Sequence, residues 1–350
     1  MARKPLNGGD DDEALDAMYE AHMKEQAKLV KPFKGARHSY TTGLIALDYY
    51  LNPQHPGIQG GSIIEMAGEG NSGKTGHTLE ICKYAMAEGA KVDYIDEEDG
   101  LKDPFVEGFG WTKYGNPQFK YTPAVGPEHV HTHFTYIYQK LQALQGSDKL
   151  HIFVIDSIPF MRPPANFEVP RMGDNIAFFN NFLKAVRPLM GNTNALMILL
   201  NSVYQDTQNK YNDYIIPGGM FLNRCCDLIT VHYKRTNPST NSIYERNAVD
   251  INSNFSITTR QKLEVKILKN KWTNSNPRFS KLSHFLNSDK RFGQFGLDNT
   301  NSMLNFLKDM GHLRSTGSTY TMDNVSMYWK KWEEAVNTDP EINRVVLNKT

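Results

Sequence analysis

Apolar residues between Gly61 and about residue 235 form short runs that alternate with longer, helically spaced stretches. The short runs are typical of buried strands and cover residues 62–67, 91–95, 151–155, 195–200 and 228–233. The stretches between them predict helices after Lys74 and at residues 128–144 and 176–190. Strands that alternate with helices are typical of a mostly parallel sheet covered on both faces. The sequence therefore predicts an α/β core.

Segments with different patterns flank this core. Residues 12–30 have an apolar stripe at helical spacing, and Pro32 ends the pattern. A lone amphipathic helix must bury its apolar stripe on its own core or on a neighbouring molecule, so we expect residues 1–37 to form an N-terminal oligomerisation helix and linker. Residues 262–268 alternate like a further strand, and helices are predicted at 302–310 and 324–336. We therefore divide the chain into this N-terminal segment, a core at 38–290 and a small C-terminal α/β domain at 291–350.

Composition limits the class of protein. A chain of 350 residues, of which 39% are hydrophobic, can bury one large core, which excludes a disordered or collagen-like protein. With 39 Lys and Arg against 38 Asp and Glu, binding to a polyanion must rely on local patches. Three cysteines, two of them adjacent, are too few for a disulfide framework. Without a signal-like start or an apolar run near the roughly 18 residues of a membrane helix, we expect a cytoplasmic protein with no membrane contact.

One segment carries a specific chemical signal. Residues 68–75 read G-E-G-N-S-G-K-T and match the phosphate-binding pattern G-x-x-x-x-G-K-[ST] between a predicted strand and a predicted helix. In such a loop the backbone N–H groups and the helix start bind phosphates, Lys74 reaches the terminal phosphates, and Thr75 binds magnesium. The pattern predicts ATP and Mg²⁺ as cofactors. The residues predicted to bind the nucleotide are Gly68, Glu69, Gly70, Asn71, Ser72, Gly73, Lys74, Thr75 and Gly76.

Two carboxylate-bearing segments follow predicted strands. Asp156 ends the apolar run 151–155, where an aspartate can hold magnesium through water or accept a hydrogen bond from Thr75. Residues 94–100 read Y-I-D-E-E-D-G and place a cluster of carboxylates after another strand. ATP hydrolysis needs a group that orients the attacking water, but an acidic loop is more often only solvated. The residues alone leave the role of this cluster open.

The order of these motifs resembles the RecA-like recombinases, which include bacterial RecA and its phage relatives of the UvsX type. Residues 40–48 are similar to the family's S-T-G-x-x-x-L-D segment, and residues 95–98 are similar to its I-D-A-E, whose last glutamate activates water. The resemblance favours Glu98 as the catalytic base. It covers most of the chain through these ordered motifs. Residues 311–320 and the following helix with Trp329 and Trp332 are loosely similar to the small C-terminal domain of RecA.

The resemblance also implies DNA-binding loops. Residues 199–202 look like the strand end where the family carries Asn-Gln, a pair that senses the γ-phosphate; Asn201 matches it and the shorter Ser202 does not. We therefore expect ATP and DNA to be coupled differently in this chain. Residues 217–219 resemble the end of the family's second DNA loop, which places the two loops at about 159–174 and 203–217. The residues that this implies for DNA binding are Arg162, Arg171, Lys210, Tyr211, Gly218 and Gly219.

Two further assignments depend on the resemblance. Residues 265–271 read V-K-I-L-K-N-K and closely resemble the segment from which two RecA lysines reach the ATP of the neighbouring subunit; Lys269 and Lys271 match them. The family usually places an aromatic residue near the adenine after an Asp-Pro pair. Here Asp103 is predicted to contact the base edge, and the stacking residue stays open because Phe105 follows the pair directly.

Local composition adds support for DNA binding. Residues 260–291 hold nine basic residues against two acidic ones, which makes this segment a candidate contact for a polyanion. The loop before Gly218 mixes tyrosines with Lys210, a combination that can stack bases and track phosphates. Three histidines, His129, His131 and His133, are assigned to a helix surface and not to a metal site, since no thiol or carboxylate set accompanies them.

These observations together predict a DNA-dependent ATPase that forms helical filaments on single-stranded DNA. It would exchange that strand with a homologous duplex during DNA recombination and repair, with loader proteins and single-stranded-DNA-binding proteins as further partners. A phage origin is favoured because the second loop and Ser202 depart from bacterial RecA. The alternatives are a hexameric helicase motor, which Lys269 and Lys271 disfavour, and an ATP-regulated single-strand-binding or annealing protein, which Glu98 disfavours.

Overall fold

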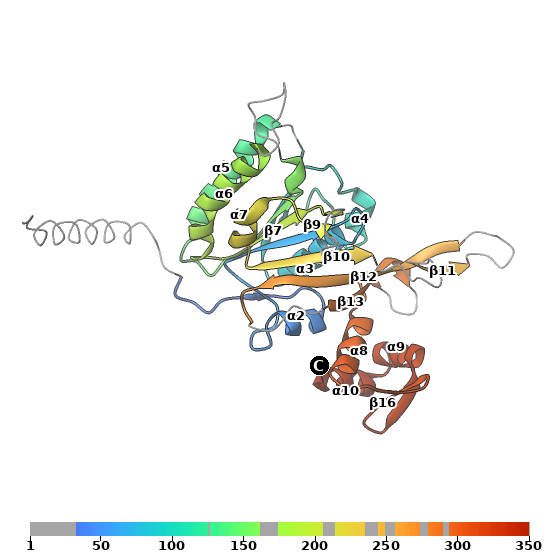
Figure 1. Ribbon diagram of the computed structural model, residues 1–350. Helices are drawn as coiled ribbons and strands as arrows, with labels where there is room; N and C mark the ends of the chain where they lie inside the picture. Colours follow the sequence, from blue (N-terminus) through green and yellow to red (C-terminus); the bar gives the residue numbers. More distant parts are fainter. Residues whose placement is uncertain are drawn as a thin grey trace, which may run out of the picture.

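A computed structural model describes residues 33–124, 127–161, 174–205, 214–234, 244–248, 256–273, 279–289 and 294–349. A twisted central sheet lies between two layers of helices, and the C-terminal segment forms a separate lobe beside one end of the sheet (Figure 1). The helix predicted at 12–30 lies outside the described residues. Within the described part, no helix is both long and apolar enough to cross a membrane.

The sheet has ten strands in the order β14-β13-β12-β10-β3-β7-β6-β4-β5, with β11 paired to β12. Neighbouring strands run parallel from β10 to β5, which confirms the predicted α/β core. The parallel strands are β3 (Ser62–Gly68), β4 (Lys91–Asp96), β5 (Phe119–Pro123), β6 (Leu150–Asp156), β7 (Asn194–Asn201) and β10 (Leu228–Lys234). Because these strands are parallel, their carboxyl ends share one edge, where the polar residues after β3, β4 and β6 are brought together.

The other strands extend the sheet in antiparallel fashion. β12 pairs with β10, and a chain reversal brings β13 against β12 and then β14 against β13. Their bounds are β11 (Tyr244–Ala248), β12 (Ser256–Asn270), β13 (Phe279–Asp289) and β14 (Gln294–Leu297). The strand predicted at 262–268 is therefore the second half of a longer one. Much of the basic segment 260–291 lies in β12 and β13.

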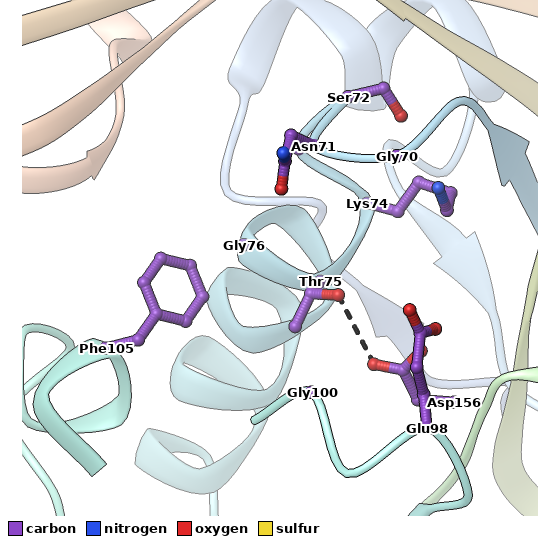
Figure 2. Close-up of a pocket in the computed structure, with 11 residues that line it drawn as sticks. Gly70, Asn71, Ser72, Lys74, Thr75, Gly76, Glu98, Gly100, Phe105 and Asp156 are labelled. Atoms are coloured by element: carbon purple, nitrogen blue, oxygen red, sulfur yellow. Dashed lines mark hydrogen bonds between the residues drawn. The ribbon is translucent and has the colours of Figure 1, made fainter. Parts of the chain in front are cut away.

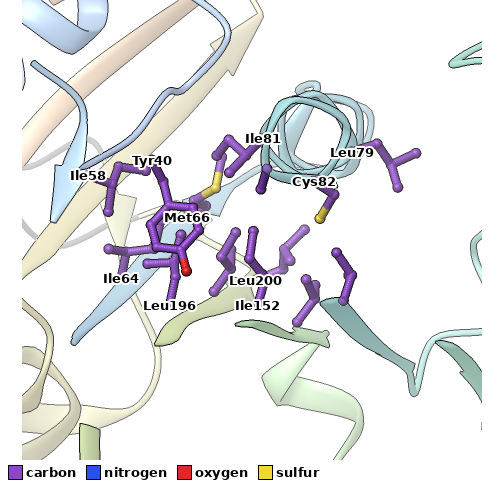
Figure 3. Packing of buried hydrophobic residues seen from close by; sticks show 14 of the residues in the cluster. Tyr40, Ile58, Ile64, Met66, Leu79, Ile81, Cys82, Ile152, Leu196 and Leu200 are labelled. Carbon is purple, nitrogen blue, oxygen red and sulfur yellow. The ribbon is translucent and has the colours of Figure 1, made fainter. Parts of the chain in front are cut away.

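Helices cover both faces of the sheet. Neighbouring residues of a strand point to opposite faces, so Ile64 joins the cluster under α3 (Lys74–Ala87) while Ile63 joins the cluster under α5 and α6. Figure 3 shows Cys82 of α3 directed toward Leu200 and Ile152 of the sheet. The covering helices of the second face are α5 (Pro127–Leu144), α6 (Asp174–Met190) and α7 (Gly219–Cys225). Cys225 and Cys226 are buried beside Leu222 in that layer.

Short elements complete the core. They are β1 (Ser39–Tyr40), α2 (Ile45–Leu51), β2 (Ile58–Gln59), α4 (Asp103–Glu107), the 3₁₀ turn η1 (Ile158–Phe160), β8 (Tyr204–Gln205) and β9 (Tyr214–Ile215). β1 and β2 pair with each other, as do β8 and β9. β8 ends directly before residues 206–213, which lie outside the described residues, and β9 begins directly after them.

The C-terminal lobe has its own core. It consists of α8 (Asn299–Asp309), β15 (Arg314–Thr316), β16 (Thr319–Met322), β17 (Val325–Tyr328), α9 (Trp329–Thr338) and α10 (Pro340–Lys349). Leu304, Leu307, Trp332 and Val346 are buried together between these elements. The helix predicted at 324–336 is wrong in its first part. Asp323, at φ 50°, begins a two-residue turn that folds Val325 back onto Met322 as a strand.

Candidate nucleotide-binding site

The predicted phosphate loop connects the carboxyl end of β3 to the amino end of α3 and lines a pocket of about 390 Å³. Residues 70–76 form one wall, and the remaining lining residues are Glu98, Gly100, Phe105 and Asp156 (Figure 2). The pocket therefore brings together three segments that the sequence identified separately. Gly68 and Glu69 are not part of its wall; their backbone carbonyls accept hydrogen bonds of 2.8 Å from the Lys74 ammonium group.

Two glycines explain the shape of the loop. Gly73 precedes α3 with φ 85°, and a Cβ atom there would lie 2.4 Å from Cδ1 of Leu263 in β12. At Gly68 a Cβ atom would lie 2.6 Å from the carbonyl oxygen of His232. Gly68 thus allows a close backbone approach, and Gly73 adopts a positive φ that favours glycine. The first N–H groups of α3 have no partners within the helix, so this loop and helix start together favour an anion.

Thr75 and Asp156 meet beneath the loop. The Thr75 hydroxyl donates to Oδ2 of Asp156 over 3.3 Å, although the two residues are far apart in sequence. Burial, together with the charges of Asp96 and Glu98, raises the pKa of Asp156 to about 6, against the opposing effect of its hydrogen bonds. A hydroxyl and a carboxylate beside a phosphate loop are the oxygen ligands that Mg²⁺ prefers. The residues present therefore fit the predicted magnesium ion.

Two adjacent glutamates point to different environments. The exposed Glu98 lines the pocket and accepts a hydrogen bond of 3.2 Å from the Ser157 hydroxyl. The carboxylate of Glu97 lies 3.0 Å from Nδ1 of His133 in α5, and both side chains are largely buried. The N–H groups of both glutamates donate to the carbonyl of Asp156. The two neighbouring glutamates therefore have different surroundings, since Glu97 contacts His133 and Glu98 lines the pocket.

The assignment of His133 to the helix surface is therefore wrong. Its side chain is only 11% exposed, because α5 turns it toward the loop that follows β4. His131, on the same helix, is exposed as expected, and nothing is described of the His129 side chain. Among the described residues, no cluster of histidine, cysteine and acidic side chains has the arrangement of a metal site.

Tyrosines hold the carboxylates at this edge of the sheet, and sequence analysis missed them. Tyr94 of β4 donates to Oδ2 of Asp156 over 2.5 Å, and Tyr121 of β5 donates to Asp96 over 3.0 Å. Asp96 also accepts the N–H groups of Gly100 and Leu101, which fixes the loop that carries Glu98. A tyrosine in a buried strand has the same pattern as any core aromatic residue, so the sequence held no signal for these contacts.

The residues predicted near the base occupy different places. Phe105 of α4 lines the pocket across from the start of α3, as Figure 2 shows. Asp103 does not reach the pocket wall, because its exposed carboxylate lies 3.1 Å from the ammonium group of Lys113. Phe105, the aromatic residue directly after the Asp-Pro pair, therefore lines this pocket, and Asp103 does not.

Asn201 is fully buried at the end of β7 and does not line the pocket. Its Nδ2 atom donates to Oε1 of Glu65 and to the carbonyl of Pro217, both over 2.7 Å. Burial raises the pKa of Glu65 to about 7, although the bond from Asn201 opposes this shift. Asn201 therefore ties the centre of the sheet to the residue just before Gly218 and Gly219, which begin α7 with φ values of 122° and 72°.

Lys269 and Lys271 lie away from the pocket. Lys269 pairs with Ile229 of β10, toward the amino ends of the parallel strands, whereas the phosphate loop follows their carboxyl ends. Its ammonium group donates to the carbonyls of Asn223 and Arg224 at the end of α7. Lys271 lies 3.0 Å from the carboxylate of Asp227. Neither lysine reaches the pocket of its own subunit.

Asp227 is a buried carboxylate that forms ion pairs with two basic side chains, Arg187 and Lys271. Arg187 of α6 approaches both of its oxygens, at 2.5 and 2.9 Å, in addition to the contact with Lys271. The backbone N–H of Ile63 donates to the same carboxylate over 3.0 Å. The remaining predicted DNA-binding residues, Arg162, Arg171, Lys210 and Tyr211, lie outside the described residues.

Known proteins include distant relatives of this chain. No family model matches the chain. It is 27% identical over 168 residues to RecA of Marinobacter nauticus, covering 47% of this chain and 45% of that RecA. It is 25% identical over 169 residues to RecA of Anaplasma marginale, covering 47% of this chain and 44% of the relative. Over 184 residues it is 27% identical to the DNA repair and recombination protein RadB of Thermoplasma acidophilum, covering 52% of this chain and 73% of RadB. The chain thus spans less than half the length of these RecA relatives.

Proposed function

Because this chain is a distant homologue of the RecA-like recombinases, we propose that it is an ATP-dependent DNA recombinase that forms filaments on single-stranded DNA. It would catalyse homologous pairing and strand exchange in recombination and repair. The observation that supports this most is the pocket in which the phosphate loop, the Thr75–Asp156 pair and Glu98 meet. A relationship to RecA and RadB combined with that pocket favours a hydrolytic motor that acts on DNA.

Each side of the proposed pocket would perform one part of ATP hydrolysis. The backbone N–H groups of residues 70–76 and the Lys74 ammonium group would bind the phosphates. Thr75 and Asp156 would hold magnesium, which supplies positive charge beside the phosphates when bound. Glu98 would orient the attacking water and accept its proton. Its carboxylate is available for this role because it lines the pocket, whereas Glu97 is bonded to His133.

The adenine base would stack on Phe105, whose ring lies beside the phosphate loop in the pocket wall. Aromatic faces suit this role because they offer a large, rigid apolar contact to a planar ring. Asp103 would contact the base edge only after it exchanges its present partner, Lys113. The position of Phe105 thus supports a stacking residue at the first place after the Asp-Pro pair.

Lys269 and Lys271 would reach the ATP of a neighbouring subunit in the filament. Their distance from the pocket of their own subunit supports this role, because a cation can stabilise the transferred phosphate only from beside it. Hydrolysis would then depend on assembly. The N-terminal segment 1–37 would contribute to the same assembly, next to the core at 38–290 and the small C-terminal domain at 291–350.

DNA would bind next to the amino end of α7. Gly218 and Gly219 lie there, and the predicted loop residues Arg162, Arg171, Lys210 and Tyr211 would complete the contact. The bond from Asn201 to Pro217 supports a mechanical link between this place and the sheet end that carries the nucleotide site. The proposed partners are single-stranded and double-stranded DNA, further copies of the chain, loader proteins and single-stranded-DNA-binding proteins. A phage origin remains part of the proposal.

The proposal is tested by electron microscopy of the full chain with single-stranded DNA and a slowly hydrolysed ATP analogue, compared with a sample without nucleotide. Helical filaments that require the nucleotide are the expected result. Closed hexameric rings would instead identify a helicase motor, and DNA coating without any nucleotide requirement would identify a binding or annealing protein. Either of these two results would overturn the recombinase assignment.

A further inference from the structure

Tyr94 is a fully buried tyrosine whose hydroxyl contacts the nucleotide site from inside the core. It lies in the middle of β4, between the sheet and α3, and its ring centroid is 5.8 Å from that of Phe119. The hydroxyl donates to Oδ2 of Asp156 over 2.5 Å. The same oxygen accepts the Thr75 hydroxyl over 3.3 Å. One carboxylate oxygen thus joins the core, the sheet end and the first turn of α3.

A carboxylate at the end of a strand has one soft degree of freedom that matters for metal binding. Rotation about its last side-chain bond is broad and roughly two-fold, so backbone position alone does not fix its oxygens. A short hydrogen bond from a buried donor to a charged acceptor is about twice as strong as a neutral one. The Tyr94 hydroxyl therefore selects one orientation of Asp156, in which Oδ2 lies against Thr75.

The backbone of Asp156 also contacts the acidic loop that follows β4. Its carbonyl accepts the N–H groups of Glu97 and Glu98 over 2.6 and 3.2 Å, so the loop that carries the proposed base is attached to the same residue. Tyr94 and Glu98 come from the same strand and the loop after it, and both meet Asp156 of the neighbouring strand β6. Asp156 is therefore a shared anchor for the proposed metal ligands and for the acidic loop.

We propose that Tyr94 is a positioning residue for magnesium: its hydroxyl holds the Asp156 carboxylate in the orientation that pairs with Thr75. The inference rests on the proposed function of the pocket as a magnesium–nucleotide site. Partners outside the ligand set usually orient metal-binding side chains, and their loss typically weakens metal affinity about 10-fold to 100-fold. A purely structural role predicts something different, since a packing tyrosine would affect stability and not the dependence on magnesium.

The test uses Tyr94→Phe in the full chain, because this change removes one oxygen atom and keeps the ring that packs in the core. Binding of a fluorescent ADP analogue is measured while the magnesium concentration is varied. We expect the variant to need at least about tenfold more magnesium than the wild type for half-maximal binding of the analogue. At saturating magnesium the affinity for the analogue should approach that of the wild type.

Tyr136→Phe is the matched control. Tyr136 of α5 also donates its hydroxyl to an aspartate of β4, Asp93, over 3.2 Å, but Asp93 does not line the pocket. This control also loses a hydrogen bond from a tyrosine to an aspartate, and it should keep the magnesium dependence of the wild type. Equal magnesium requirements for wild type, control and Tyr94→Phe would overturn the inference. An absence of nucleotide binding by the wild type would instead refute the proposed function.

A double-mutant cycle keeps the test decisive if Tyr94→Phe also lowers stability. The magnesium dependence is compared among wild type, Tyr94→Phe, Asp156→Asn and the double variant. If Tyr94 acts through Asp156, its substitution changes the magnesium requirement much less in the Asp156→Asn background than in the wild type. Equal effects in the two backgrounds would show that Tyr94 does not act through this carboxylate.

Discussion

At the scale of single residues, the site depends on which of several similar side chains faces the pocket. Glu97 and Glu98 are neighbours with the same chemistry, yet one is bonded to His133 and the other lines the pocket beside Ser157. Sequence alone identified an acidic cluster, and the resemblance to a family selected Glu98. The structure adds the physical difference, which is that α5 carries a histidine to Glu97 and leaves Glu98 exposed.

The first prediction concerns this pair. Glu98→Gln should lower the rate of ATP turnover about 100-fold or more and leave ATP affinity nearly unchanged, because an amide cannot accept the proton of the attacking water. Steady-state turnover and equilibrium binding of ATP are measured in parallel. Glu97→Gln is the matched control and should keep most of the turnover, since its carboxylate contacts His133. Loss of turnover in the control but not in Glu98→Gln would reverse the two assignments.

The second prediction concerns Gly73. In Gly73→Ala the new Cβ atom would lie 2.4 Å from Leu263, at a φ of 85° that an alanine rarely adopts. The Leu263 side chain or the start of α3 must then shift, and because the φ is also strained for alanine we expect nucleotide affinity to fall about tenfold or more. Adding Leu263→Ala removes the contact and leaves the unfavourable φ, so the double variant should recover part of the affinity. Wild-type affinity in the single variant, by titration with a fluorescent nucleotide, would contradict the geometric argument.

At the scale of elements, Asn201 links the central strands of the sheet to the start of α7. Asn201 ends β7 and donates both to Glu65 of the neighbouring strand β3 and to Pro217 before α7. Glu65 is 2% exposed, and burial raises its pKa from 4.5 to about 7. A buried acid with a raised pKa makes this junction between elements sensitive to pH.

The third prediction follows from the sign of that shift. The folded protein holds the Glu65 proton more tightly than the unfolded chain, so the stability it gives is present below pH 4.5 and is lost as pH rises through about 7. The loss is on the order of 3 kcal/mol. Glu65→Gln keeps an acceptor for Asn201 and removes the titration. Relative to wild type, the variant should therefore gain stability between pH 5 and pH 8.

Denaturant unfolding of both proteins at pH 5 and pH 8 measures this difference. Comparing the two proteins cancels the contribution of other groups that titrate in this range, such as Asp48, whose pKa burial raises to about 6. The same change in unfolding free energy for wild type and variant would show that Glu65 does not titrate between these values.

Sequence patterns predicted some of the helices, strands and contacts of this fold and missed others. Buried runs such as the one in β6 and the helically spaced stretches of α5 and α6 predicted the parallel core, because both faces of that sheet are apolar. The phosphate loop was predicted because its chemistry needs contiguous residues. The contacts of Tyr94, His133 and Glu65 were not, because each depends on a partner from a distant element. The strand β17 was missed because its pairing with β16 overrides a helix-like pattern.

At the scale of the whole molecule, the proposed active site is incomplete in one subunit. Glu98 and the phosphate loop lie at the carboxyl edge of the parallel strands, whereas Lys269 and Lys271 lie toward their amino ends. A filament in which each subunit contacts the next through different surfaces would bring the two sets together at every junction. The proposed enzyme is therefore formed by neighbours and not by a single chain.

The fourth prediction tests this arrangement by mixing variants. Glu98→Gln subunits lack the base, and Lys269→Ala/Lys271→Ala subunits lack the lysines, so each protein alone should show little DNA-stimulated ATP turnover. In an equal mixture, about a quarter of the junctions would combine an intact base with intact lysines from the neighbour. Turnover of the mixture should therefore clearly exceed that of either variant. Activity no higher than the average of the two would contradict lysines that act between subunits.

The Asp227 carboxylate has two cationic partners, Arg187 and Lys271, and this matters for the proposed role of Lys271 at a neighbour's ATP. Lys271 and Arg187 both hold this buried carboxylate, and Arg187 contacts both of its oxygens. Removing the sole partner of a buried charge costs several kcal/mol, which would oppose assembly at every step. If Lys271 contacts a neighbour's phosphate as proposed, the Arg187 guanidinium would still pair with the Asp227 carboxylate. In the proposed filament, Lys271 could therefore change partner at a lower cost than the sole partner of a buried charge would incur.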